Sequence, residues 1–199
     1  MNQPSEHDYH CLKRILRYIF GTLGRGLLIR LGDLELQGFS DSDWANDKND
    51  RKSTSGFLVF LGLNLISWCT KKQPKVSRSS TEAEYRALAL LATETMWVTY
   101  ILRQLRATHT VPALYGDNKS TICVAKNSVL HTRMKHVDAD CLFVRDEVQA
   151  GTMTVQYVPT EEQPADILTK PLRADSTITS VPSFCSLPLS SAGGGDNNR

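Results

Sequence analysis

Residues 80–106 hold the longest regular pattern in the chain. Apolar side chains recur there at steps of three, four or seven residues, which predicts a single helix with one apolar face. These side chains are Leu88, Leu91, Val98, Leu102 and Leu105. Ser80 or Thr81 can cap the start of the helix, and Glu84 lies on the apolar row, four residues before Leu88. A carboxylate in such a row is unusual, and we expect Glu84 to lie where the core meets a cleft.

Short strand patterns lie on both sides of this helix. Three strands are expected before it, joined by short turns that favour an antiparallel meander: residues 34–40, 57–61 and 65–69. The elements expected after it are strands at 111–115 and 152–158 and helices at 120–126, 133–149 and 165–170. This order predicts an α/β fold, or mixed α+β fold, in which helices flank one mixed sheet.

The two ends of the chain differ from its middle. Residues 5–21 predict an amphipathic, basic helix, and a glycine-containing connector follows it up to residue 33. After Leu172 the regular patterning fails, and Ser, Pro, Gly and Asn dominate. We therefore expect one folded domain over residues 34–173 and a disordered tail over residues 174–199.

The composition excludes several classes of protein. The 199 residues include 23 lysines and arginines and 21 acids, a net charge of +2, so any nucleic-acid contact must depend on local clusters of charge. The five cysteines lack the C-x-x-C spacing of a zinc or redox site, and we expect reduced thiols. No apolar run approaches the ~18 residues of a membrane span, and we expect no secretory signal at the start.

Four acids stand where predicted elements begin or end. They are Asp41 after the first strand, Glu84 in the first turn of the long helix, Asp117 after the fourth strand and Asp166 at the start of the last helix. Such ends can converge at one edge of a sheet, where carboxylates repel one another unless cations neutralise them. Oxygen ligands without sulfur nearby suit Mg²⁺ or Mn²⁺, and two ions about 4 Å apart can clamp the attacking water and the leaving oxygen in phosphodiester cleavage. Alternatively, Asp117 and Asp166 are plain helix caps.

Two of these assignments have a neighbouring competitor. Asp43 shares a face with Asp41 on an extended chain, and Asp41 is preferred because it comes directly off the strand, where the backbone is most rigid. Glu82 competes with Glu84. Glu84 shares the apolar face that packs on the sheet, whereas Glu82 is better suited to capping the helix.

Several long segments of the chain resemble one known family. They are GFSDSDWANDKNDRKSTSGFLVFLG, ISWCTKKQPKVSRSSTEAEYRALA, LYGDNKSTI, MKHVDA and YVPTEEQPADILTKPL. Over about residues 34–172 they are similar to the ribonuclease H domain in the Pol polyprotein of copia-type LTR retrotransposons. The leading segment, ending HCLKRILRYIFGTLGRGLLI, resembles the end of the reverse transcriptase that precedes this domain in that family. Residues 1–33 are accordingly expected to be a remnant of that enzyme.

The resemblance implies a ribonuclease H-like fold with a five-stranded mixed sheet and two Mg²⁺ ions, for which Mn²⁺ can substitute. The catalytic, metal-binding acids of the family fall on the same four acids singled out above. The implied activity is an endonuclease that cuts the RNA strand of an RNA–DNA hybrid during reverse transcription and leaves 5′-phosphate and 3′-hydroxyl ends. Many ribonucleases H carry a histidine in the loop before the last acid. Here that loop, VPTEEQPAD, has none, and the roles of His131 and His136 stay open.

Binding a hybrid duplex requires cations that follow its phosphates. One basic set directly precedes the long helix and comprises Lys71, Lys72, Lys75 and Arg78, with Ser80 as a neighbouring hydroxyl. A second set is Arg51 and Lys52. Hydroxyls near these cations can contact phosphates and the 2′-OH that distinguishes RNA from DNA. Trp44 and Trp68 are expected to be core or packing residues rather than platforms on which bases stack.

The resemblance also implies partners and a location. The partners are an RNA–DNA hybrid and the upstream reverse transcriptase domain of the parent polyprotein, with no membrane. The location is intracellular, either cytoplasmic or nuclear, with a virus-like particle for the parent element. Two other functions remain open: a catalytically silent retroelement fragment that acts as a nucleic-acid-binding or interaction module, and a different metal-dependent nuclease or integrase on the same fold.

Overall fold

The structure is a computed structural model, and it describes residues 3, 5–24, 26–27, 29–127 and 139–170. These residues divide between two compact units, with the division between residues 27 and 29. The tail expected over residues 174–199 lies outside the described residues, as do His131 and His136.

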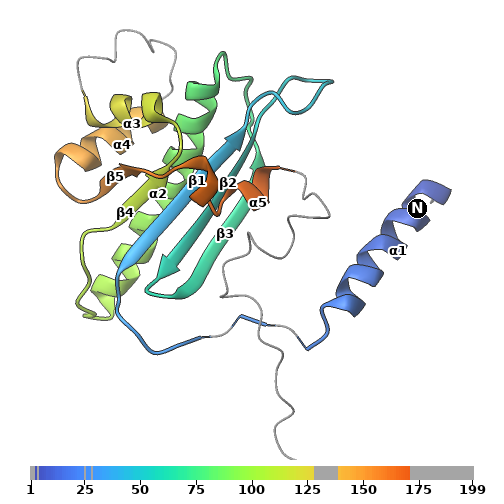
Figure 1. Cartoon of the computed structure of the whole chain (residues 1–199), viewed down its shortest axis with the longest axis horizontal. Coiled ribbons are helices and arrows are strands. Elements are labelled where there is room, and N and C mark those ends of the chain that lie inside the picture. The colour runs from blue at the N-terminus through green and yellow to red at the C-terminus, as the bar shows by residue number, and fades with distance from the viewer. Residues whose placement is uncertain (1–2, 4, 25, 28, 128–138, 171–199) are drawn as a thin grey trace, which may run out of the picture. The chain divides into compact units, whose positions relative to one another are not determined.

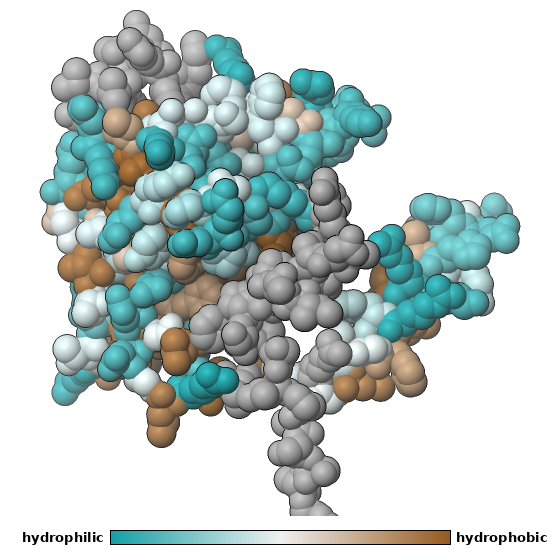
Figure 2. Space-filling model, in the orientation of Figure 1, coloured by the Kyte–Doolittle hydropathy of each residue, from teal (hydrophilic) through white to brown (hydrophobic). Residues whose placement is uncertain are grey.

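The described residues of the first unit include the helix α1 (Glu6–Gly21), where residues 5–21 were predicted to be helical. Ser5 caps it through a reciprocal pair of hydrogen bonds, because the Ser5 hydroxyl accepts from the Asp8 N–H and the Asp8 carboxylate accepts from the Ser5 N–H. No residue of α1 is buried. In Figure 2 hydrophobic residues gather along one side of this helix, as its amphipathic pattern predicts.

The second unit is built on a five-stranded sheet with the order β3-β2-β1-β4-β5 (Figure 1). Its strands are β1 (Leu36–Asp43), β2 (Thr54–Leu61), β3 (Asn64–Lys72), β4 (Ala113–Gly116) and β5 (Thr154–Tyr157). β1, β2 and β3 pair antiparallel, whereas β4 pairs parallel with both β1 and β5. The predicted mixed sheet, with three antiparallel strands followed by two more, is thereby confirmed.

The helices of this unit are α2 (Ser80–Gln104), α3 (Lys119–Lys126), α4 (Ala139–Gln149), α5 (Asp166–Thr169) and the short 3₁₀ turn η2 (Thr160–Glu162). α2 packs on β1, β2 and β4, and α4 packs on α2 and α3. α5 packs on β1, β2 and β3. None of the helices in the described part of the chain is both long and apolar enough to cross a membrane.

Two glycines show that α2 and α5 lie on opposite faces of the sheet. A Cβ on Gly38 would meet Leu91 of α2, whereas a Cβ on Gly56 would meet Thr169 of α5. Gly56 pairs with Asp41, which lies three residues after Gly38 on β1. Since side chains alternate between the faces of a sheet, Gly38 and Gly56 point in opposite directions. Figure 1 agrees, with α2 behind the sheet and α5 in front of it.

The core lies between the sheet and α2. Its most buried side chains include Leu36, Val59, Leu88, Leu91, Leu114, Met153 and Val155. The predicted apolar row of α2 is buried as far as Leu102, but Leu105 is 71% exposed because the helix ends at Gln104. The helix cap is Ser79, whose hydroxyl accepts from the Glu82 N–H, rather than Ser80 or Thr81. Among the described cysteines, Cys11, Cys69 and Cys123 are free thiols.

Candidate metal centre

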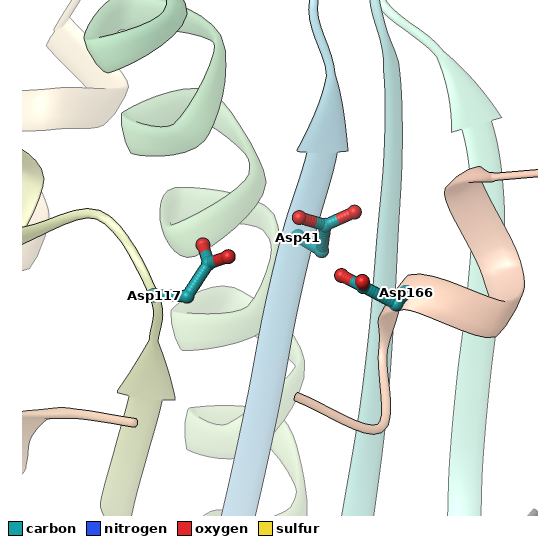
Figure 3. A group of neighbouring side chains, drawn as sticks. All are labelled: Asp41, Asp117 and Asp166. Atoms are coloured by element: carbon teal, nitrogen blue, oxygen red, sulfur yellow. The ribbon is translucent and has the colours of Figure 1, made fainter. Parts of the chain in front are cut away.

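Three of the four predicted acids converge at one place on the sheet. Asp41, Asp117 and Asp166 each offer a carboxylate oxygen, and these oxygens all lie within 4.8 Å of one another. Figure 3 shows the three side chains pointing toward one another from β1, from the end of β4 and from the start of α5. Residues separated by 49 or more positions in the chain therefore form a single group of hard oxygen ligands.

The parallel pairing of β1 with β4 explains why Asp41 and Asp117 meet. Phe39 pairs with Tyr115 across the two strands, and each acid follows its paired residue by two positions. The side chains of Asp41 and Asp117 consequently lie at the same level along the two neighbouring strands and on the same face of the sheet.

Asp41 lies inside β1 rather than after it, which corrects the prediction that the strand ends at residue 40. The ladder with β2 continues to Asp43, and Asp41 pairs with Gly56. Asp41 is only 2% exposed. Asp43, the competing ligand, is not part of the three-carboxylate group. Asp41 was preferred over Asp43 because its backbone was expected to be rigid. That backbone is held even more firmly than expected, because the hydrogen-bonded strand continues on both sides of Asp41.

Asp166 reaches the group because α5 packs closely on β2. At Gly56 an added Cβ would lie 2.8 Å from Leu168 Cβ and 2.8 Å from Thr169 Cγ2, so a side chain there would displace α5. The loop before α5 is held by Gln163, whose side-chain amide donates to the Ser40 carbonyl at 3.0 Å. Asp166 does not cap α5, since the N-cap residue is Ala165 and no side chain there makes a cap hydrogen bond.

Asp117 is oriented by a neighbouring hydroxyl. The Thr160 Oγ1 of η2 donates to Asp117 Oδ2 at 2.8 Å. The alternative of a plain helix cap is wrong for Asp117, because Asn118 caps α3 by accepting from the Thr121 N–H at 3.0 Å. Asp117 is thereby left to face the other two carboxylates.

The fourth acid, Glu84, lies beside the group and is tied to β1. Its Oε1 accepts from the N–H of Ser42 at 3.1 Å and from the hydroxyl of Ser42 at 3.0 Å. Burial raises the pKa of Glu84 to about 8, with further increases from the negative charges of Asp41 and Asp117 and a smaller opposing effect from the Ser42 hydrogen bonds. Glu82, its competitor, instead accepts from the N–H of Arg78 and pairs with Arg86, as a helix-start residue would.

Burial and neighbouring negative charges also raise the pKa of Asp41. Burial raises its pKa to about 6, against the lowering effects of a hydrogen bond from Thr169 and the positive charge of Lys170. The charges of Asp166 and Asp117 raise it further. Carboxyl groups with raised pKa values, gathered at one site, are typical of a place where a cation supplies the missing positive charge.

A divalent cation fits this set of donors. All three ligand groups are carboxylates, the donor type that Mg²⁺ and Mn²⁺ prefer. The Oδ1 of Asp166 is buried and accepts no hydrogen bond from the described part of the chain. A buried carboxylate oxygen without a partner is costly, and a bound cation would relieve that cost.

Two residues of this site were not singled out from the sequence. The Thr169 hydroxyl donates to Asp41 Oδ2, and the ammonium of Lys170 lies 2.6 Å from Asp166 Oδ2 and 3.9 Å from Asp41 Oδ1. Their signal was present in the segment DILTK, where Lys170 follows Asp166 by four residues, the spacing of an ion pair on one helix face.

The basic residues expected to grip a hybrid lie around the ends of β2 and β3. Lys71, Lys72 and Lys75 line a cavity of about 480 Å³ together with Arg86. Lys72 is already paired with Asp47 and with Asp50, the latter at 2.9 Å. Of the remaining predicted cations, Arg51 and Arg78 are exposed. The Nζ of Lys52 lies 3.9 Å from Asp50 Oδ2. Ser80 is exposed in the first turn of α2.

Neither tryptophan is a core residue, so the core alternative of that prediction was wrong. Trp44 is 44% exposed and Trp68 is 53% exposed. Trp68 lies on β3, an edge strand, and the ring N–H of Trp44 donates to the carbonyl of Ser77 at 3.0 Å.

Comparison with known proteins gives extensive sequence relationships, of which two follow. The chain is 46% identical over 174 residues to the retrovirus-related Pol polyprotein from transposon RE1 of Arabidopsis thaliana, covering 86% of this chain and 12% of that protein. It is 36% identical over 170 residues to the retrovirus-related Pol polyprotein from transposon TNT 1-94 of Nicotiana tabacum, covering 85% of this chain and 13% of that protein. The chain thus spans a small part of these relatives' length.

Other comparisons are weaker. No family model matches the chain. Among solved structures, LC11-RNase H1, isolated from compost by a metagenomic approach, matches with a TM-score of 0.49 and 14% sequence identity, covering 68% of this chain and 92% of that one.

The sheet order β3-β2-β1-β4-β5, with α2 and α5 on its two faces, defines a ribonuclease H-like fold of the α/β class. The sequence relationships then give the family. The chain belongs to the retrovirus-related Pol polyproteins of copia-type retrotransposons and corresponds to their ribonuclease H domain.

Proposed function

We propose that this chain is a divalent-metal-dependent endonuclease that cuts the RNA strand of RNA–DNA hybrids during retrotransposon reverse transcription. The observation that carries the proposal is the convergence of the Asp41, Asp117 and Asp166 carboxylates within 4.8 Å, together with the unpartnered, buried Oδ1 of Asp166. The family relationship supports the choice of substrate.

In this proposal Asp41, Asp117 and Asp166 hold the ions, which are Mg²⁺ with Mn²⁺ as a substitute, and Glu84 completes the set. When bound, such ions supply a water of lowered pKa and positive charge beside the leaving 3′ oxygen. A nearby cation also favours the ionised form of the carboxyls, which opposes the rise in pKa that burial causes in Asp41 and Glu84.

The other residues orient these ligands. Thr169 donates to one oxygen of Asp41 and Thr160 donates to one oxygen of Asp117, and these hydrogen bonds fix the orientation of both carboxylates within the three-carboxylate group. The Ser42 hydrogen bonds keep Glu84 against β1. A rigid set of ligands costs little reorganisation when charge develops on a phosphate.

The hybrid itself is proposed to lie across the basic surface formed by Arg51, Lys71, Lys75 and Arg78. Residues 34–173 are proposed to be the nuclease domain, residues 1–33 a remnant of the reverse transcriptase end, and the upstream reverse transcriptase its partner in the parent polyprotein. An intracellular location, within a virus-like particle for the parent element, belongs to the same proposal.

Cleavage of a labelled hybrid tests this function. An RNA strand labelled at its 5′ end is annealed to DNA and incubated with the full chain and Mg²⁺. The wild type is expected to cut the RNA, whereas Asp166→Asn is expected to lose more than about 100-fold in rate, since even partners that only orient metal ligands contribute about 10–100-fold.

Asp146→Asn is the matched control, because Asp146 is an exposed acid on α4. It is expected to cut at the wild-type rate. Equal cutting by the wild type and Asp166→Asn would refute the proposed centre. Binding of the hybrid without any cutting in Mg²⁺ or Mn²⁺ would favour the catalytically silent alternative.

A further inference from the structure

Lys170 places a positive charge beside two members of the three-carboxylate group. Its Nζ lies 2.6 Å from Asp166 Oδ2 and 3.9 Å from Asp41 Oδ1. The residue directly follows α5, which begins at Asp166, so the helix brings acid and cation to the same face at a spacing of four residues. Among the described ion pairs, no other joins a lysine or arginine to these carboxylates.

The neighbouring Thr169 completes the arrangement. Its hydroxyl donates to Oδ2 of Asp41, while Lys170 faces Oδ1 of the same carboxylate. Consecutive residues at the end of α5 therefore engage both oxygens of Asp41 and one oxygen of Asp166. The close packing of α5 over Gly56 fixes this position.

The electrostatics of the group explain why a cation is held there. Three carboxylates within 4.8 Å repel one another, and the ammonium offsets part of that repulsion. Burial lowers the pKa of Lys170, but its hydrogen bond with Asp166 and the charges of Asp41, Asp166 and Asp117 outweigh burial and raise the pKa above its ordinary value. The ammonium is accordingly held in its charged form.

A divalent ion held by Asp41 and Asp166 would lie close to this ammonium, because Lys170 faces one oxygen of each carboxylate. Mg²⁺ binds carboxylate oxygens at about 2.0–2.1 Å, and two cations beside the same carboxylates repel each other. Lysine suits a reversible contact, because its ammonium is a compact charge on a flexible four-carbon stem.

We propose that Lys170 is an internal counter-ion of the acidic group, which competes with divalent ions for Asp41 and Asp166 and moves away when an ion binds. Lys170 is thus a positioning residue that holds the carboxylates together without metal and weakens metal binding. This inference rests on the proposed function, since it takes the acidic group to be a metal centre.

Calorimetric titration of the full chain with Mg²⁺, and separately with Mn²⁺, tests the inference through metal affinity rather than activity. Lys170→Met removes the charge and keeps an unbranched stem. Its affinity for the ion is expected to rise roughly tenfold, the smaller end of the effect of one charge within about 4–6 Å on an ionisable neighbour. In EDTA the same variant is expected to unfold at a lower temperature than the wild type, because the carboxylates lose their counter-ion.

These two changes have opposite directions, which simple damage to the fold would not produce. Lys170→Arg keeps the positive charge and is expected to bind the ion with nearly wild-type affinity. Lys126→Met removes one positive charge from an exposed lysine at the end of α3 and is expected to change neither property. Lys170→Gln repeats the test with a polar side chain.

The outcomes separate the inference from the proposed function. If the wild type binds the ion and both Lys170→Met and Lys170→Gln bind it equally or more weakly, the competition is refuted and the metal centre stands. If neither the wild type nor these variants bind Mg²⁺ or Mn²⁺, the metal centre of the proposed function fails, and the inference fails with it. Tighter binding by the variants, abolished by adding Asp166→Asn, supports both.

Discussion

Glu84 of α2 and Ser42 of β1 are joined by two hydrogen bonds, both to Glu84 Oε1, from the Ser42 N–H at 3.1 Å and from its hydroxyl at 3.0 Å. Ser42 is the residue after Asp41, so this contact fixes the start of α2 directly beside the acidic group. The contact also holds Glu84 where burial and neighbouring carboxylates make its charge costly.

Stability without metal is therefore expected to fall as the pH rises from 5 to 8. The folded-state pKa values of Asp41, about 6, and Glu84, about 8, exceed their ordinary values of 3.8 and 4.5. In this window the folded state keeps protons on these two carboxyls that the unfolded state has already released. The stability that these protons contribute is fully present below about pH 4. It is lost first as the pH rises past the pKa of Asp41 near 6 and then as it rises past the pKa of Glu84 near 8. In EDTA the midpoint temperature of thermal unfolding is expected to fall by several degrees between pH 5 and pH 8.

Glu84→Gln is the control for this pH dependence. Glutamine does not titrate, so the variant is expected to lose much less stability between pH 6.5 and 8 than the wild type. Asp47 and Asp50, whose pKa values are lowered by hydrogen bonds with Lys72, change charge below this window and do not obscure it. A wild-type midpoint in EDTA that stays level or rises from pH 5 to 8 would contradict the expectation.

Addition of Mg²⁺ is expected to reverse the trend. An ion that binds only the folded state adds a stability of RT ln(1 + [Mg²⁺]/Kd), which is about 2.7 kcal/mol at 100 times Kd. Binding requires ionised carboxyls, so the midpoint at pH 8 is expected to rise more than the midpoint at pH 5. The measurement is thermal unfolding with Mg²⁺ in place of EDTA. Asp166→Asn should lose this gain and Asp146→Asn should keep it; an equal gain in both variants would place the ion elsewhere.

The sequence was sufficient for the fold and for the convergence of the acids, for identifiable reasons. The order of apolar strands and helices predicts the mixed sheet, and acids at the ends of neighbouring elements were expected to meet at one edge. Asp41 and Asp117 do meet, because β1 and β4 pair in parallel. What escaped prediction depends on position in the sheet. The stretch Asp41–Ser42–Asp43 carries no apolar side chain, so its membership of β1 depends on backbone pairing with β2, which a local pattern does not reveal.

Tertiary placement also explains the other errors. Trp68 has the apolar character of a core residue, but β3 is an edge strand and leaves it 53% exposed. Lys170 was not predicted to join the site, because its contact with Asp41 depends on the packing of α5 on β1 and β2, which a local pattern does not reveal. The spacing of Asp166 and Lys170 was visible, but the proximity of Asp41 was not.

Gly56→Ala tests the packing that brings α5 to the site. An added Cβ would lie 2.8 Å from both Leu168 Cβ and Thr169 Cγ2, and α5 would have to shift. Overpacking of this kind costs about 1–3 kcal/mol, which urea unfolding measures. Because Thr169 and Asp166 shift with α5, affinity for Mg²⁺ is expected to fall as well.

Gly116→Ala is the matched control for this change. A Cβ at Gly116 meets no described atom within 4 Å, although this glycine ends β4 directly before Asp117. Its stability and Mg²⁺ affinity are expected to stay close to those of the wild type. The packing argument would be wrong if Gly56→Ala kept wild-type Mg²⁺ affinity, or if both glycine variants lost it to the same degree.

The salt dependence of hybrid binding distinguishes cations that contact phosphates from cations already paired within the protein. Lys71 is exposed at the end of β3, whereas Lys72 is engaged by Asp47 and Asp50. Each phosphate neutralised by a protein cation contributes about 0.9 to the slope of log K against log salt concentration. Lys71→Ala is therefore expected to reduce the slope by roughly one, while Lys72→Ala leaves it nearly unchanged.

The measurement is fluorescence anisotropy of a labelled hybrid in Ca²⁺ over a series of KCl concentrations. An unchanged slope for Lys71→Ala would contradict a phosphate contact at Lys71. An equal reduction for both variants would mean that the hybrid contacts Lys72 as well as Lys71, despite its ion pairs. Either result would contradict the proposed binding surface.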